Sequence, residues 1–385
     1  MKNIMLVFGT RPEAIKLAPV ALELQKQPEV KTTICVTAQH RQMLDQVLGL
    51  FDLKPDIDLD LMQSNQTLAE LTARVLVRMD ETLSNQKPDT VVIQGDTTTV
   101  MATAMAAFYR QIPVAHVEAG LRSGDLRSPF PEEMNRLVAT TVSELHFAPT
   151  KAAVNALQKE GVPSEKIFLT GNSVIDALKL IVDKPIAKIA KDLLEQLEID
   201  KSSSRRKLIL VTAHRRENFG PRLESICEAL KALAVRNVDV VILYPVHLNP
   251  NVYEPVHRIL GGLDRVILTE PLTYDVLAHL MKASYLALTD SGGIQEEAPS
   301  LGKPVLVMRT ETERPEGVKA GTAKLVGPFA ENIIRETENL LYDETAYHEM
   351  SRAINPYGDG KAARRIVDVL MTGDLADTES FGGDF

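Results

Sequence analysis

Five short segments, each directly after an apolar run, contain charged and small residues suited to binding an anion. They are residues 9–11 (G-T-R), 94–96 (Q-G-D), 118–120 (E-A-G), 213–217 (A-H-R-R-E) and 290–293 (D-S-G-G). In open α/β sheets, ligands bind beyond the carboxyl ends of the strands. If the apolar runs are parallel strands, these segments lie at the carboxyl ends of the sheets, and the sequence predicts an anion-binding site there.

The turn at residues 289–298 (T-D-S-G-G-I-Q-E-E-A) shows this chemistry most clearly. Ser291 is expected to cap the following helix, while Gly292 and Gly293 let backbone N–H groups approach an anion closely. A carboxylate beside a phosphate would repel it, so Glu297 is expected to bind ribose hydroxyls instead. The turn is therefore predicted to hold the diphosphate of a nucleotide.

A second turn, G-T-R-P-E at residues 9–13, is expected to open a helix with Pro12 near its first position. Arg11 and Lys16 are expected to face the diphosphate. Neither this turn nor any other segment has the G-x-G-x-x-G spacing of a dinucleotide site, so no cofactor of that kind is expected. His116 and Glu118 alternate along one strand and so share a face. No histidine or cysteine spacing predicts a metal site.

The composition excludes several other classes of protein. The net charge is −9 and the basic residues are scattered, which argues against a nucleic-acid partner. The two cysteines, Cys35 and Cys227, lie in apolar patterns and are expected to be core residues rather than a disulfide framework. The N-terminal apolar run 4–8 is too short for a signal sequence, and no run reaches the roughly 18 residues of a membrane span. We therefore expect a cytoplasmic protein with no membrane partner.

The elements that must position these residues alternate along the chain. Strands are expected at 4–8, 33–37, 90–94, 114–117, 145–148 and 167–170, and again at 208–212, 240–244, 265–268, 285–289 and 304–308. Amphipathic patterns such as 13–26, 67–83 and 99–109 separate them and predict helices. This alternation predicts an α/β fold of two Rossmann-like domains with mostly parallel sheets, facing across a cleft.

The expected domains are 1–172 and 173–360, and the second is expected to bind the nucleotide. A last helix at 361–371 is expected to cross back to the first domain. The tail 374–385 is acidic and contains glycine, so it is predicted to be disordered.

Motifs along nearly the whole chain resemble those of one family. They are F-G-T-R-P-E-A-I-K (8–16), T-A-Q-H-R-Q-M-L-D (37–45), G-D-T-T-T (95–99), H-V-E-A-G-L-R-S (116–123), P-E-E-M-N-R (131–136), T-A-H-R-R-E-N (212–218), Y-P-V-H-L-N-P (244–250), T-D-S-G-G-I-Q-E-E-A-P-S-L-G-K-P (289–304), E-R-P-E-G (313–317) and N-P-Y-G-D-G (355–360). In these motifs the chain resembles the bacterial, non-hydrolysing UDP-N-acetylglucosamine 2-epimerases. The resemblance implies the fold of two-domain (glycosyltransferase-B-like) nucleotide-sugar enzymes and a homodimer.

The resemblance also assigns site residues. It places catalysis on Asp96, Glu118, Glu132 and His214, with Lys16 in the pocket. The UDP contacts that it implies are Arg11, His214, Ser291, Gly292, Gly293, Glu297 and Arg314. Some bacterial members bind a second UDP-N-acetylglucosamine as an activator, and the matching residues are Gln39, Gln42, Glu132, Arg215 and His247.

The sequence departs from the family pattern in two places. Where many members contact the nucleotide through a glutamine and a phenylalanine, this chain has Leu272 and Leu277. An arginine expected before Q-T-L is replaced by Asn65, at a position tied to activation.

The implied reaction sets chemical demands. The proton on carbon 2 of the sugar is not acidic, and without a dinucleotide cofactor the remaining route is elimination of UDP, followed by its addition to a glucal intermediate. This needs carboxylates that reach both faces of the sugar, for which Asp96, Glu118 and Glu132 are the candidates. It also needs positive groups and helix N-termini that stabilise the departing diphosphate.

Three other functions remain possible from the residues. A glycosyltransferase of the same fold would depend on an acceptor, and a hydrolysing epimerase would release free N-acetylmannosamine. A catalytically inactive nucleotide-sugar sensor would bind without turnover. A related substrate, such as a UDP-2,3-diacetamido sugar, is a further alternative for an epimerase.

Overall fold

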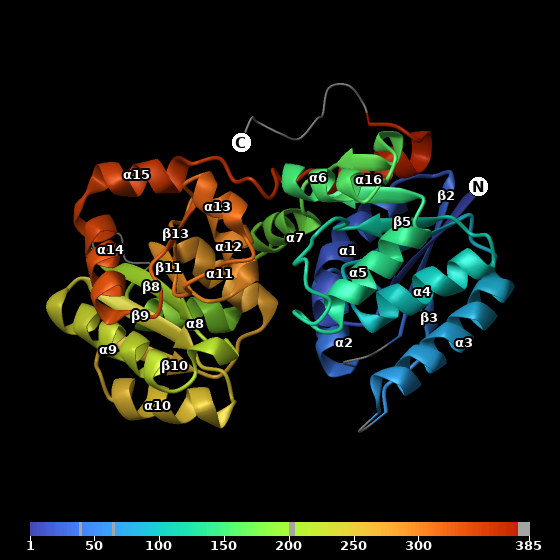
Figure 1. Ribbon diagram of the computed structural model, residues 1–385. Helices are drawn as coiled ribbons and strands as arrows, with labels where there is room; N and C mark the ends of the chain where they lie inside the picture. Colours follow the sequence, from blue (N-terminus) through green and yellow to red (C-terminus); the bar gives the residue numbers. More distant parts are fainter. Residues whose placement is uncertain (38–40, 64–65, 200–204, 376–385) are drawn as a thin grey trace. The chain divides into compact units, whose positions relative to one another are not determined.

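The computed structural model describes residues 1–37, 41–63, 66–199 and 205–375 (Figure 1). The chain forms two compact units. Among the described residues, unit 1 contains 1–179 and 357–375, and unit 2 contains Leu180–Pro356. Most of the expected tail, 374–385, lies outside the described residues.

Unit 1 is built on a seven-stranded sheet in which every pair of neighbouring strands is parallel. Its spatial order is β3-β2-β1-β4-β5-β6-β7. The strands are β1 (Lys2–Phe8), β2 (Val30–Val36), β3 (Ile57–Asp58), β4 (Thr90–Gln94), β5 (Val114–Val117), β6 (Leu145–Ala148) and β7 (Ile167–Leu169). The six strands expected in this half are all present, and the two-residue β3 was not expected.

Eight helices of the described chain belong mainly to unit 1. They are α1 (Arg11–Gln25), α2 (Arg41–Leu50), α3 (Leu68–Gln86), α4 (Thr98–Tyr109), α5 (Glu132–Val142), α6 (Lys151–Lys159), α7 (Ser173–Val182) and α16 (Ala362–Thr372). Leu71 and Val75 of α3, Val100 of α4 and Ala139 of α5 pack with alternate residues of the central strands, such as Met5. This packing buries one face of the sheet.

The boundary between the units differs from the one expected at residue 173. The division falls after Lys179, within α7, because the first part of this helix is buried in unit 1. Ile175 and Leu178 have no exposed surface, and the Asp176 carboxylate accepts backbone hydrogen bonds from Ala362 and Ala363 of α16. The returning helix α16 therefore lies in unit 1.

Unit 2 repeats the same plan with a six-stranded parallel sheet in the order β10-β9-β8-β11-β12-β13. The strands are β8 (Lys207–Thr212), β9 (Val240–Pro245), β10 (Val266–Thr269), β11 (Leu286–Thr289), β12 (Val305–Val307) and β13 (Ala323–Leu325). The helices are α8 (Lys188–Gln196), α9 (Pro221–Arg236), α10 (Pro250–Leu260), α11 (Tyr274–Ala283), α12 (Gly292–Glu297), α13 (Pro315–Lys319), α14 (Ala330–Tyr342) and α15 (Glu344–Arg352). Five of these strands were expected, and β13 was not.

The strands of unit 2 are mostly apolar because both faces of the sheet are covered. Ile209 and Ile242 belong to a core that includes residues of α9, α10 and α14. The alternating residues Leu208 and Val241 belong to a second core with residues of α8 and α11. This coverage explains why the sequence shows continuous apolar runs rather than an alternating pattern.

Parallel pairing places the ends of neighbouring strands side by side. In unit 1, Gln94 at the end of β4 pairs with Val117, the residue before Glu118. In unit 2, Thr212 at the end of β8 pairs with Thr289, the residue before Asp290. Each unit therefore gathers its charged segments at one end of its sheet. Within the described chain, no helix is both long and apolar enough to cross a membrane.

Candidate active site

Glu118 lies at the centre of a hydrogen-bonded cluster in unit 1. Its backbone has a φ of +64°, a left-handed conformation that costs a non-glycine residue of the order of 1 kcal/mol or more. Lys16 Nζ contacts both carboxylate oxygens, at 2.6 and 2.7 Å. The side-chain amide of Gln94 donates to Oε2, and Asn172 Nδ2 donates to Oε1 at 3.1 Å. These donors fix the carboxylate and help to offset its burial.

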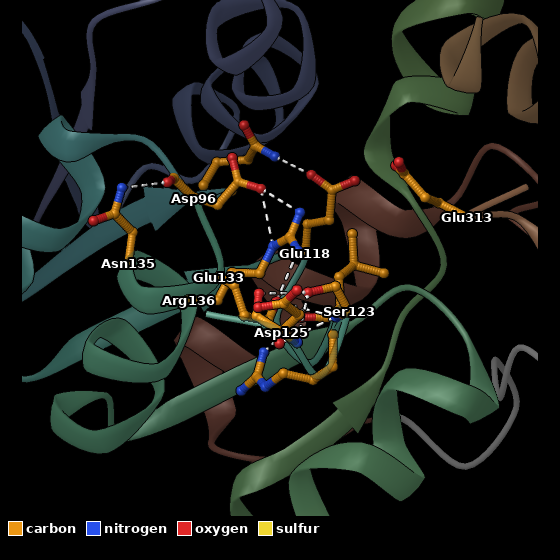
Figure 2. Close-up of polar contacts among 12 residues, drawn as sticks. Asp96, Glu118, Ser123, Asp125, Glu133, Asn135, Arg136 and Glu313 are labelled. Carbon is orange, nitrogen blue, oxygen red and sulfur yellow. Dashed lines mark hydrogen bonds and ion pairs between the residues drawn. The ribbon is translucent and has the colours of Figure 1, made fainter. Parts of the chain in front are cut away.

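Asp96 belongs to a second cluster, on the neighbouring strand end (Figure 2). Arg136 of α5 contacts Asp96 Oδ2 through Nη2 at 2.6 Å and Nε at 3.0 Å, and Nη1 contacts Glu133 Oε2 at 3.0 Å. Asn135 Nδ2 donates to the backbone oxygen of Asp96 at 2.8 Å. Helix α5 therefore holds both the side chain and the backbone of Asp96.

The environments of Asp96 and Glu133 shift their pKa values in opposite directions. Burial raises the pKa of Asp96, although the Arg136 charge opposes this. Burial also acts to raise the pKa of Glu133, but backbone N–H groups of Ser123 and Gly124, together with Arg136, lower it overall. Glu133 thus fixes the loop and the arginine, while Asp96 is the carboxylate with the raised pKa.

Glu132, which the family resemblance placed in catalysis, begins helix α5. Its Oε2 atom is buried and has no hydrogen-bond partner within the described structure. A buried carboxylate oxygen without a partner is unfavourable unless a ligand or another group satisfies it. The position therefore suits a group that contacts a substrate.

The G-T-R-P-E turn forms the entrance to α1, but its backbone does not remain open for an anion. Glu13 accepts hydrogen bonds from Gly9 N at 2.8 Å and Thr10 N at 2.7 Å. Lys16 pairs with Glu118. Arg11 makes no hydrogen bond or ion pair with the described residues. Two cations were expected to face a diphosphate. Lys16 is paired with a carboxylate, whereas Arg11 has no carboxylate partner among the described residues.

In unit 2, the strand ends of β8 and β11 meet around Asp290. His214 N and Arg215 N both donate to Asp290 Oδ2, at 2.9 and 2.8 Å. The His214 ring stacks on that of His247, with centroids 5.7 Å apart and planes at 15°. Burial lowers the pKa of His214, with the Asp290 charge opposing it and His247 and Arg215 reinforcing it.

The glycine turn at the start of α12 is flanked by two guanidinium groups. A Cβ atom built on Gly292 would lie 3.8 Å from Nη2 of both Arg215 and Arg314. Ser291 occupies the N-cap position, but its side chain makes no capping hydrogen bond, so the expected cap is wrong in this respect. The turn at Gly292 instead lies beside two guanidinium groups, an arrangement that suits the binding of an anion.

The two glutamates of α12 differ in role. Glu297 is buried and accepts a hydrogen bond from the Tyr274 hydroxyl at 2.7 Å, and its Oε2 lies 3.7 Å from a Cβ built on Gly293. Glu296 is ion-paired with Arg314. The helix then continues as a 3-10 turn (Ala298–Leu301), and Pro299 in this turn has no backbone N–H to extend the α-helix.

The structure describes only some of the residues that were matched to an activator site. Gln39 and Asn65 lie outside the described residues, as does the side chain of Gln42. Arg215 and His247 lie in unit 2, where Arg215 adjoins the Gly292 turn and His247 stacks on His214. Two residues assigned to activation therefore adjoin residues assigned to UDP.

The comparisons with known proteins agree over nearly the whole chain. The family model of UDP-N-acetylglucosamine 2-epimerases matches residues 22–371. The chain belongs to this family. The UDP-N-acetylglucosamine 2-epimerases of Escherichia coli K12 and Salmonella typhimurium LT2 are 54% and 53% identical to it, each over 96% of this chain and 98% of the relative.

The similarity extends to the three-dimensional fold of a solved relative. The UDP-GlcNAc 2-epimerase of Neisseria meningitidis, bound to UDP-GlcNAc, is 48% identical with a TM-score of 0.86, and the match covers 96% of this chain and 99% of that one. The chain is therefore an epimerase, an enzyme of the isomerase class, with a glycosyltransferase-B-like fold.

Several residues of the candidate site were given no individual role by sequence reasoning. They are the partners of the predicted groups: Gln94, Asn172, Glu133, Arg136, Asp290 and Glu296. Five of them fall inside the family motifs or the strand-end segments, which was the available signal. Asn172 lies in neither and could not have been singled out.

The sequence predicted no metal site, and the arrangement of possible ligands in the described part of the chain bears on this. There, no group of three or more His, Cys, Asp or Glu side chains is arranged to hold a metal ion. Cys35 and Cys227 are both buried, and burial raises the pKa of each thiol to about 12. They are core residues.

Proposed function

We propose that this epimerase interconverts UDP-N-acetylglucosamine and UDP-N-acetylmannosamine by elimination and re-addition of UDP, without hydrolysing the product. Family membership supports the substrate, since the Neisseria meningitidis relative was solved with UDP-GlcNAc bound. The observation that carries the mechanism is the pair of carboxylates Asp96 and Glu118, each held by its own cation at the end of adjacent strands.

The UDP is assigned to unit 2. The Gly292 turn supplies backbone N–H groups, and Arg215 and Arg314 supply positive charge beside it. Glu297, which is buried and accepts a hydrogen bond from the Tyr274 hydroxyl, is the acceptor proposed for the ribose hydroxyls. Arg11 of unit 1 is the additional cation proposed for the diphosphate. Stabilising the departing diphosphate lowers the barrier to breaking the bond at carbon 1.

The proton transfers at carbon 2 are assigned to the carboxylates of unit 1. Epimerisation by elimination requires removal of a proton from one face and delivery to the other. Glu118, fixed by three donors, and Asp96, whose pKa is raised by burial, are two chemically different groups that suit these tasks. Glu132, with its buried unpartnered oxygen, is proposed as the third group in contact with the sugar.

A heavy-water assay tests the proposal. The chain is incubated in D₂O with UDP-N-acetylglucosamine and, separately, with a UDP-2,3-diacetamido sugar. The expected result is the epimeric UDP-sugar with deuterium at carbon 2. Absence of both the epimer and the deuterium contradicts the proposal. Free N-acetylmannosamine plus UDP would identify a hydrolysing enzyme, and turnover only with an added sugar acceptor would identify a glycosyltransferase.

Activation by a second UDP-N-acetylglucosamine is also proposed. The contacts of Arg215 and His247 with the UDP-binding residues support it, because a ligand on these side chains would bear directly on the Gly292 turn and on His214. The test starts the reaction from UDP-N-acetylmannosamine alone. Adding a small amount of UDP-N-acetylglucosamine is expected to raise the initial rate, and an unchanged rate contradicts activation.

The homodimer and the cytoplasmic location stay predictions, and we further propose that the product supplies activated N-acetylmannosamine to surface polysaccharide synthesis. Light scattering of the purified chain tests the first, because a dimer has twice the mass of the 42.4 kDa chain.

A further inference from the structure

Asp290 is a fully buried carboxylate beneath the turn that carries His214. Its exposed fraction is 0%, and its Oδ2 atom accepts three hydrogen bonds. Two come from the backbone, His214 N at 2.9 Å and Arg215 N at 2.8 Å, and the third comes from Asn218 Nδ2 at 3.1 Å. The Oδ2 atom therefore makes all the hydrogen bonds by which Asp290 holds this turn.

The second oxygen has no such role. Asp290 Oδ1 is buried and has no hydrogen-bond partner in the described structure. It lies 3.8 Å from His214 Nδ1, which is about 0.6 Å beyond the usual hydrogen-bond range. A buried charged oxygen is costly to leave unpaired, and a proton on Nδ1 is the group that would pair it.

The His214 ring is held from two sides. His247 stacks on it, and Asp290 lies at its Nδ1 edge, while the side chain keeps 41% exposure. The charged and titratable groups that act on the ring are Asp290, His247 and Arg215. In neutral histidine, the nitrogen that carries the proton is set by the partner of that nitrogen. A carboxylate facing Nδ1 favours the Nδ1–H tautomer and leaves Nε2 free to exchange a proton.

We propose that Asp290 is a positioning residue that orients His214 through Nδ1, so that Nε2 exchanges the proton of the leaving diphosphate. When the bond between carbon 1 and the diphosphate oxygen breaks, that oxygen receives the bonding electrons and takes a proton from Nε2 of the imidazolium. The proton returns to Nε2 when UDP adds back. Asp290 takes no part in the proton transfer itself. The proton transfer rests on the proposed epimerisation, whereas the ring orientation can be tested without it.

The first experiment examines the wild-type chain without substrate. Histidine ¹⁵N chemical shifts, with the His214 signals assigned by their loss in His214→Gln, report which ring nitrogen carries the proton. The expected result is an Nδ1–H ring at high pH. An Nε2–H ring would overturn the proposal, and this measurement needs no Asp290 variant to fold.

The second experiment replaces the carboxylate by an amide. Asp290→Asn keeps an oxygen for the turn N–H groups but can offer an NH₂ group to Nδ1. The expected results are a shift toward the Nε2–H tautomer, a lower His214 pKa, and a fall in kcat of about a hundredfold or more, as for an imidazole held in the wrong tautomer. The KM is expected to change less than kcat.

A double-mutant cycle separates orientation from general damage to the fold. If Asp290 acts through His214, Asp290→Asn should have little further effect on kcat in a His214→Gln background. An equal loss in both backgrounds overturns the proposal. Asp176→Asn is the matched control, since Asp176 is also a buried carboxylate that accepts two backbone N–H groups, but lies in unit 1. It should leave the His214 tautomer unchanged.

Failure of the proposed function looks different. If the wild-type chain shows no epimerisation, the proposed proton transfer from His214 is contradicted as well. The tautomer of His214 and its response to Asp290→Asn still decide whether Asp290 orients the ring.

Discussion

Asp96 and Glu133 share the guanidinium of Arg136, yet their pKa values move in opposite directions. The difference comes from their other partners. Glu133 accepts two backbone N–H groups that stabilise its charge, whereas the partly buried side chain of Asp96 lies near the Glu118 charge. A difference of this kind between neighbouring carboxylates is typical of acid–base sites.

The pH dependence of the reaction is expected to respond to Arg136. The Arg136 charge lowers the pKa of Asp96, so Arg136→Met should raise that pKa further. If Asp96 acts in its ionised form, the acidic limb of the kcat/KM profile moves to higher pH. The exposed ion pair of Arg110 with Asp80 provides a control, because Arg110→Met should leave the profile unchanged. If both limbs of the profile stay unmoved in Arg136→Met, Asp96 has no acid–base role.

Two buried histidines make the stability of unit 1 depend on pH. Burial lowers the pKa of His116 and His146, which face each other across β5 and β6, to about 4. The unfolded chain binds these protons more tightly, so stability is fully present above the ordinary pKa of about 6.5 and is lost as the pH falls toward 4. For His116 alone the loss approaches about 3 kcal/mol at pH 4.

His116→Gln tests this contribution. His116 Nε2 lies 2.7 Å from the Gly95 oxygen, and a glutamine amide can donate to the same oxygen without titrating. Urea unfolding of both proteins at several pH values should show a difference that shrinks as the pH falls from 6.5 to 4. Asp176 acts oppositely in this range, since its pKa is raised to about 6, but it cancels in the comparison. A constant difference would contradict the prediction.

At the scale of elements, two helices begin with the same capping box in different surroundings. Thr10 and Glu13 start α1, and Thr67 and Glu70 start α3. Glu13 is buried and also accepts from the Thr97 hydroxyl, at 2.5 Å, whereas Glu70 is exposed. The same sequence pattern therefore fixes a strand-to-helix turn in one place and only a helix end in the other.

Removing the two glutamates is expected to have unequal effects. Glu13→Ala leaves the buried N–H groups of Gly9 and Thr10 without an acceptor and should cost about 2–4 kcal/mol of unfolding free energy. Glu70→Ala is the matched control, and water can replace the lost acceptor there, so its loss should be clearly smaller. Urea unfolding of both variants measures the difference. Equal losses would show that burial of the first box does not matter.

The whole molecule consists of two parallel-sheet units joined twice by the chain, once in α7 and once before Tyr357. The second crossing is anchored in unit 1 by Arg365 of α16. This arginine is buried and contacts Asp359 at 2.8 and 2.7 Å and the Thr170 oxygen at 3.1 Å. The last helix is thus part of the core of unit 1.

Loss of the Arg365 contacts is expected to lower local stability in unit 1 only. Arg365→Met leaves Asp359 and the Thr170 oxygen without their cation and should speed amide exchange in α16 and α7 by tenfold or more, a loss of roughly 1–3 kcal/mol of local stability. Hydrogen exchange read by mass spectrometry should show unchanged rates in unit 2. Arg364→Met, on the exposed side of the same helix, is the control. Faster exchange throughout unit 2 would contradict a role confined to unit 1.

The sequence by itself determined the class of fold and the positions of the charged segments. Continuous β-branched runs between amphipathic patterns leave little choice but covered parallel strands, and β4, β5 and β6 have the expected bounds. The short strands β3 and β13 were missed because two or three residues carry no periodic signal. The boundary was displaced because the burial of α7 depends on a helix that begins almost 190 residues later.

Only the tertiary structure decided which partner each charged residue has. Glu118 with Asn172, Asp96 with Arg136, and Asp290 with His214 are pairs separated by 40 or more positions in sequence. The pKa shifts of Asp96, Arg136 and His214 depend on distances and burial that no local pattern encodes, because electrostatic interactions follow separation in space and the surrounding solvent. The types of residue at the strand ends could be predicted from the sequence. Their partners and their environments depend on the tertiary fold.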